Sequence, residues 1–138
     1  MKFGEKDTSY RAAGCEAGIR QLVTRFYDLM DELPDARAIR AMHPADLTES
    51  REKLALFLCG WLGGPRKYQE KYGTISIPGI HQHLHINATH RDAWLNCMAL
   101  AAEEQEYAPE FKTYLLEQLA VPAERVRIVS EKIHGNPG

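Results

Sequence analysis

The stretch from His81 to Cys97, HQHLHINATHRDAWLNC, carries the side chains of this chain best suited to chemistry. Four of the six histidines lie in its first ten residues. If the segment is extended, His81, His83 and His85 share one face, where three imidazoles can hold zinc or copper. If it forms a helical turn, His81 and His85 alone share a face. The spacing leaves open which of these histidines binds a metal.

Few other patterns in the sequence point to a reactive site. There is no GxGxxG, P-loop, HExxH or GxSxG motif. The three cysteines, Cys15, Cys59 and Cys97, are widely spaced and form no CxxC pair. This argues against a disulfide framework or a cysteine zinc site and favours a reducing cytosol. Cys59 and Cys97 lie in apolar segments and are expected to be small core residues.

Length and composition predict one domain over residues 1–138, with a flexible polar leader at 1–8 and a flexible tail at 135–138. The 44% hydrophobic content is enough for a sizeable core. A net charge of −2 gives no broad basic field to bind nucleic acid or an anionic membrane surface. The apolar runs are too short to span a bilayer, and the first residues lack a signal-peptide core. We therefore expect a cytoplasmic protein.

Apolar residues recur at three- and four-residue steps, which predicts four substantial helices and an all-α fold. The first helix is expected from about Glu16 to Leu33, because Pro34 disfavours helix in the residue before it. Asp46 or Thr48 can cap the second helix, which should end at the glycines before Pro65.

Asn87 is a good N-cap for the third helix, which carries Trp94 on its inward face. Pro109 starts the fourth helical region, and Pro122 is expected to break or kink it. Between the main helices we expect a short helical connector over Ala36–Met42 and an ordered loop over residues 66–79.

Tyr27 places a phenol on the apolar face of the first helix. Considered from this helix alone, it is a core tyrosine whose hydroxyl bonds a backbone carbonyl.

Taken together and in order, these motifs resemble the group II truncated haemoglobins. That family has an all-α truncated globin fold, a two-over-two helical sandwich around haem. The resemblance covers roughly residues 10–105. It rests on Phe26-Tyr27, His43-Pro44, Trp61-Leu62-Gly63-Gly64-Pro65 with Tyr68, His81, and Arg91-Asp92-Ala93-Trp94-Leu95 with Cys97-Met98.

The resemblance implies that His81 is the proximal ligand of the haem iron. Tyr27 and Trp94 correspond to distal residues that donate hydrogen bonds to bound dioxygen, and His43 to a variable corner position on the same side. Ser50 corresponds to the distal gate. The positions that make apolar contacts with the porphyrin are Leu54, Phe57, Leu84 and Ile86. Lys53 and Tyr68 correspond to positions that contact a propionate.

The same resemblance implies a haem cofactor, dioxygen, nitric oxide or similar small ligands, and an unidentified reductase as partner. Bound dioxygen takes negative charge from ferrous iron, so each buried donor stabilises it by about 1.5–3 kcal/mol. Two or three donors make release slow. This favours ligand retention, or polarisation of an O–O bond, over transport.

Two alternatives remain open at this stage. One is a haem-based redox enzyme with peroxidase-like or nitric-oxide-detoxifying turnover. The other is a non-haem metal-binding module built on His81, His83 and His85. In the haem protein, His83 and His85 are either solvated or supply a second ligand to iron.

Overall fold

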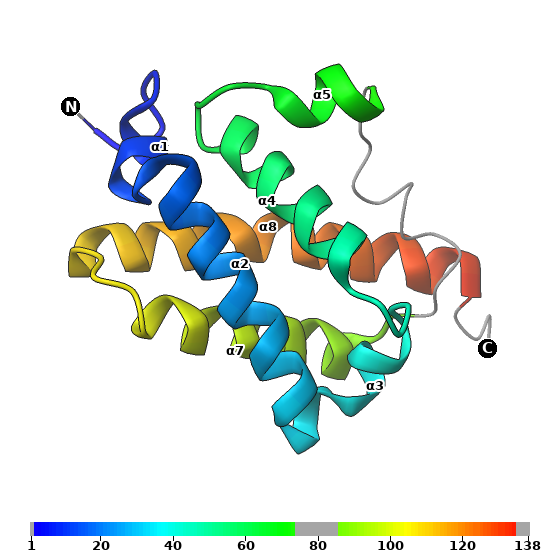
Figure 1. Cartoon of the computed structure of the whole chain (residues 1–138). Helices are drawn as coiled ribbons and strands as arrows, with labels where there is room; N and C mark the ends of the chain where they lie inside the picture. Colours follow the sequence, from blue (N-terminus) through cyan, green and yellow to red (C-terminus); the bar gives the residue numbers. More distant parts are fainter. Residues whose placement is uncertain (1, 74–85, 135–138) are drawn as a thin grey trace.

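The structure, a computed structural model, describes residues 2–73 and 86–134 (Figure 1). Within these residues every regular element is a helix, as the sequence periodicity predicts. The elements are α1 (Thr8–Ala12), α2 (Cys15–Glu32), η1 (Pro34–Ala36), α3 (Arg37–Ala41), α4 (Thr48–Trp61), α5 (Lys67–Tyr72), α7 (Ala88–Glu103) and α8 (Pro109–His134).

The four long helices form two pairs, one in front of the other. In Figure 1, α2 and α4 lie in front of α7 and α8. Helix α2 packs against both α4 and α7, and α7 packs against α8, so α2 is the central element. Its apolar stripe accounts for this position. The largest fully buried side chains include Ile19, Leu22, Phe26 and Met30 of α2, Leu58 of α4, Met98 of α7, and Phe111 and Leu115 of α8.

The ends of the long helices lie close to the residues expected from the sequence, although only α7 has a side-chain cap among α2, α4 and α7. Leu33 is extended just before Pro34, so α2 ends one residue earlier than expected. At the start of α4 the Asp46 carboxylate accepts hydrogen bonds from the Thr48 amide and hydroxyl. At the start of α7, Asn87 accepts a bond from the His90 amide, and the Asn87 amide donates to the His90 ring. The predicted cap at Asn87 is therefore confirmed.

The turn after α4 requires glycine at position 63. Gly63 has a φ of +97°, and a Cβ there would lie 2.0 Å from the Lys6 carbonyl oxygen. No other residue tolerates both the left-handed backbone and this contact. Nearby, the Leu62 carbonyl accepts a bond from the Tyr10 amide. The segment just after α4 is thereby joined to the N-terminal residues.

One expectation from the sequence is wrong, and another is answered in part. Residues Lys67–Tyr72, expected to lie in an ordered loop, form α5; residues 74–79 of that predicted loop lie outside the described part. Pro122, expected to break or kink the last helix, does not break it, since α8 continues through it. A proline inside a helix loses one backbone hydrogen bond. Leu119 before it and Val126 after it are both buried, so packing on both sides favours continuation.

The N-terminal residues pack on the last helix. The Phe3 ring lies 5.3 Å from the Phe111 ring and 5.2 Å from the Tyr114 ring, centroid to centroid. The expected tail at 135–138 lies outside the described residues. Cys59 and Cys97 are buried and free, as expected for small core residues. In the described part of the chain, no helix is both long and apolar enough to cross a bilayer.

Candidate functional site

Four aromatic side chains from three separate parts of the chain meet beside the second half of α2. The Phe26 ring lies 4.9 Å from the Tyr27 ring and 5.1 Å from the Trp94 ring, edge to face in both pairs. The Tyr27 ring lies 5.7 Å from the His43 ring. The structure therefore brings together Tyr27, Trp94 and His43, the three residues expected on the distal side. Phe26, which is fully buried, links the first two.

Two hydrogen-bond donors flank Phe26, and neither has a hydrogen-bond partner in the part of the chain that the structure describes. Tyr27 is only 5% exposed, and its hydroxyl makes no hydrogen bond to another residue of 2–73 or 86–134. The simpler expectation, that the Tyr27 hydroxyl donates to a backbone carbonyl, is not met by any carbonyl of the described residues. The indole N–H of Trp94 likewise has no acceptor within these ranges. Burial raises the pKa of Tyr27 to about 12, against a small opposing effect of Arg51. Tyr27 is therefore protonated at neutral pH and able to donate.

His43 has a fixed tautomer. Its Nδ1 atom lies 2.8 Å from the Ile39 carbonyl oxygen. A carbonyl can only accept, so Nδ1 carries a hydrogen and donates it. In the neutral ring Nε2 is then an acceptor, and it donates only when the ring is an imidazolium. Neutral His43 therefore presents an acceptor at its free ring nitrogen, whereas Tyr27 and Trp94 present donors.

Helix α4 carries three residues that were expected to line the haem pocket. Ser50, Leu54 and Phe57 share a face at four- and three-residue steps, and all three are half-buried. The Phe57 ring lies 6.3 Å from both the Trp61 ring and the Tyr68 ring of α5. A hollow of about 340 Å³ opens at this junction, where its walls include Phe57, Trp61 and Tyr68.

Lys53, expected near a propionate, lies on the same side of α4 as Tyr68 and α5. Its ammonium group is 3.1 Å from a Glu49 carboxylate oxygen and 5.3 Å from the centre of the Tyr72 ring. The bond to Glu49 raises the pKa of Lys53. The lysine therefore has two protein partners in this structure.

The proximal part of the predicted site falls mostly outside the described residues. The residues that the structure does not describe include His81, His83, Leu84 and His85. Ile86 is described and half-buried, and its amide donates to the Ser130 hydroxyl at 2.6 Å. This bond joins the start of α7 to α8. Within residues 2–73 and 86–134, no three histidine, cysteine or acidic side chains gather as metal ligands would.

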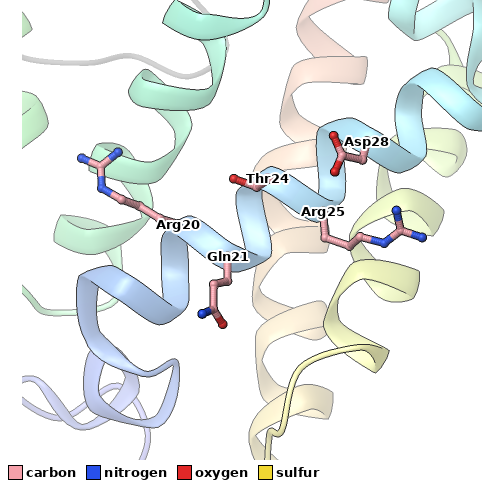
Figure 2. Close-up of a pocket in the computed structure, with 5 residues that line it drawn as sticks. All are labelled: Arg20, Gln21, Thr24, Arg25 and Asp28. Carbon is pink, nitrogen blue, oxygen red and sulfur yellow. The ribbon is translucent and has the colours of Figure 1, made fainter.

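A second hollow lies on the outer face of α2 and measures about 320 Å³ (Figure 2). Its charged groups are already paired. Arg20 reaches Glu52 of α4 at 2.7 Å, and Arg25 reaches Glu104 just after α7 at 2.6 Å. Asp28 pairs with Arg51. This surface therefore offers no uncompensated charge for a ligand, and the distal aromatic group remains the candidate site.

Comparisons with known proteins show the family to which this chain belongs. The model of the bacterial-like globins matches residues 8–127. The chain is 33% identical over 114 residues to the group 2 truncated hemoglobin YjbI of Bacillus subtilis, covering 83% of each protein. It is also similar to two solved structures.

The first is the group II 2-on-2 hemoglobin of Agrobacterium tumefaciens, with a TM-score of 0.84 and 37% identity over 90% of this chain and 96% of that one. The second, described as the truncated oxygen-avid haemoglobin of Bacillus subtilis, has a TM-score of 0.79 and 32% identity over 86% and 97%. The helical architecture and these matches define a haem-binding globin fold. The chain belongs to the bacterial-like globins, and among them to the group II truncated haemoglobins.

Haem is the cofactor of this family, and the described residues fit it. Leu54, Phe57, Trp94 and Ile86 are apolar but only half-buried, which leaves carbon surface for a flat apolar group to cover. The donors of Tyr27 and Trp94, which have no partner in residues 2–73 and 86–134, suit a polar ligand on one face of such a group. Both properties are expected of a haem pocket.

The raised pKa of Tyr27 predicts a loss of stability in alkali. The pKa of Tyr27 is about 12 in the folded protein and 10.0 in the unfolded chain. Between these values the hydroxyl ionises in the unfolded chain but not in the folded protein, which favours unfolding. Its contribution is therefore complete below pH 10 and is lost as the pH approaches about 12. A shift of this size corresponds to about 3 kcal/mol. Urea unfolding should show the free energy of unfolding falling by up to this amount between about pH 10 and 12.

The control for this prediction is Tyr27→Phe, which should lose part of the alkaline decline. Burial also raises the pKa of Tyr107 to about 12. Tyr107 should therefore still cause its own share of the alkaline decline in the Tyr27→Phe variant. An equal decline in both proteins would contradict the assignment to Tyr27.

Proposed function

We propose that this protein binds dioxygen and similar diatomic ligands at a haem iron held by His81, with Tyr27 and Trp94 as hydrogen-bond donors to the bound ligand. The observation that carries the proposal is the pair of donors on either side of Phe26 without a protein partner in the described residues. The similarity to an oxygen-avid relative supports it.

In this proposal His81 would hold the haem iron as a neutral imidazole, and the bound haem would supply reversible binding of a diatomic ligand. The Tyr27 hydroxyl and the Trp94 indole N–H donate to the negatively charged ligand and slow its release. His43 contributes a third hydrogen bond only as an imidazolium, because its Nδ1 hydrogen is already donated to Ile39.

The remaining pocket roles rest on the family resemblance. Ser50 is the small residue at the distal gate, where it leaves the access route open. Lys53 and Tyr68 are proposed to contact a propionate from the α5 side. The apolar walls are Leu54, Phe57, Leu84 and Ile86. We place the protein in the cytoplasm, with a reductase that returns the iron to the ferrous state.

An optical titration with haemin tests the proposed function. The purified protein should bind about one haemin per chain and give a Soret band, with distinct ferric, ferrous and dioxygen-bound spectra. A haemin-treated protein without a Soret band would rule the proposal out. Zinc bound instead by His81, His83 and His85 would leave the visible region blank, so the same spectrum separates the non-haem alternative.

A second candidate function is redox turnover, peroxidase-like or nitric-oxide-detoxifying. The same two unpaired donors favour it, because they can also polarise an O–O bond. Steady-state turnover of peroxide or nitric oxide should then exceed that of free haemin. Equal rates would leave ligand binding as the function.

A further inference from the structure

Arg51 of α4 reaches across to α2 on both sides of Tyr27. One terminal nitrogen of its guanidinium group donates to the Thr24 carbonyl at 3.0 Å, and the other donates to the Asp28 carboxylate at 3.1 Å. Thr24 precedes Tyr27 by three residues and Asp28 follows it directly. Figure 2 shows where Thr24 and Asp28 lie along α2. Between these two bonds, the guanidinium carbon lies 5.8 Å from the centre of the Tyr27 ring.

We propose that Arg51 is a positioning residue for Tyr27: it holds the phenol ring against α2 so that the hydroxyl keeps one orientation toward the bound ligand. The inference rests on the proposed function, because it assigns to Arg51 the orientation of that function's main donor.

The geometry of arginine explains the effect. Two hydrogen bonds to α2 fix the plane of the guanidinium group, which a single bond or a lysine would not do. A cation within about 6 Å of an aromatic ring is attracted to the ring face. On its other sides the Tyr27 ring contacts the rings of Phe26 and His43. With Arg51 in place the ring is therefore contacted on several sides, and the hydroxyl orientation is set before a ligand binds.

Charge supports the same assignment. The Arg51 guanidinium lowers the pKa of Tyr27, although burial raises it more. This interaction shows that the positive charge is close enough to act on the phenol. A more polar O–H bond is also a better donor to an anionic ligand.

Arg20 provides a matched control on the same pair of helices. It also bridges α2 and α4, through bonds of 2.7 Å and 3.3 Å to Glu52, and it also has a partner on α2, Glu16 at 3.0 Å. Its contacts do not include Tyr27. Comparing Arg51→Met with Arg20→Met therefore separates an effect on Tyr27 from the loss of any ion pair between these helices.

The experiment compares both variants as haem-loaded proteins. Arg51→Met should speed dioxygen dissociation by about two- to fivefold, as expected for a lost cation–π contact, while Arg20→Met leaves it unchanged. In the carbon monoxide form, the C–O stretching band should shift and broaden in Arg51→Met alone. The NMR signal of ¹³C-labelled Tyr27, assigned by its loss in Tyr27→Phe, should move in that variant alone.

A double variant completes the cycle. In a Tyr27→Phe background, Arg51→Met should have no further effect on dioxygen release, since it acts through the hydroxyl. Equal release rates and equal Tyr27 signals in Arg51→Met and Arg20→Met would overturn the proposal. If Arg51→Met does not fold, Asp28→Ala removes one acceptor of the Arg51 guanidinium, and an unchanged Tyr27 signal there would also overturn it. Failure of the proposed function looks different, because Tyr27→Phe would then itself leave dioxygen release unchanged.

Discussion

Replacing Tyr27 with phenylalanine should speed dioxygen release from the ferrous protein by roughly ten- to a hundredfold. A hydrogen bond to a charged group contributes about 1.5–3 kcal/mol, and each 1.4 kcal/mol is a factor of ten. The hydroxyl is protonated at neutral pH, because burial raises its pKa to about 12. Stopped-flow replacement of dioxygen by carbon monoxide measures the rate directly.

The variant should also fold normally. The Tyr27 hydroxyl has no partner in the described part of the protein, so its removal leaves no group there with a broken bond. Tyr114→Phe, on α8 beside Phe3, is the control for tyrosine removal away from the site and should not change the rate. The same measurement on Trp94→Phe separates the contributions of the two donors. An unchanged rate in Tyr27→Phe would remove Tyr27 from the distal site.

The four long helices could be predicted from the sequence because their apolar stripes are regular. The stripe through Ile19, Leu22, Phe26 and Met30 matches the buried face of α2, and Asn87 marks the first turn of α7. These features are local, since they depend on residues within a few turns of one another.

The features that were missed depend on contacts between distant residues. The sequence of α5 has weak periodicity, and its helix is supported by a bond from Lys67 to Glu16 and by the Tyr68 ring against Phe57. Pro122 has a strong local tendency to interrupt a helix. Burial of apolar side chains on both sides of it outweighs that tendency, and the sequence of α8 alone does not reveal this burial.

The same distinction applies to the site. The types of residue at positions 27, 43 and 94 could be matched to a family pattern in advance, and the structure brings them together. The roles of their neighbours could not be predicted in this way. A surface arginine such as Arg51 has many possible partners, and nothing in the sequence selects Thr24 and Asp28, which precede it by 27 and 23 residues. The tautomer of His43 likewise depends on the direction of one carbonyl, that of Ile39.

Replacing His81 with glycine should abolish the fixed proximal ligand and have the largest effect of any single change. Without an imidazole to bind the iron, haem would be held only by the apolar walls and the proposed propionate contacts, and the ferrous and dioxygen-bound spectra of the wild type should disappear. Glycine leaves a space the size of the lost ring. Imidazole added to the solution should therefore restore the wild-type spectra, because the free ring can replace the lost His81 side chain.

His83→Gly and His85→Gly are the matched controls, because they place the same flexible residue in the same segment. Both should keep the wild-type ferrous spectrum, and neither should respond to imidazole. If His85→Gly loses the spectrum and His81→Gly keeps it, the iron ligand is His85. The family pattern then matches this sequence four residues further along than the resemblance implies. Loss in His81→Gly alone, with rescue by imidazole, assigns the ligand to His81, because a merely structural histidine would not be replaced by a free imidazole ring.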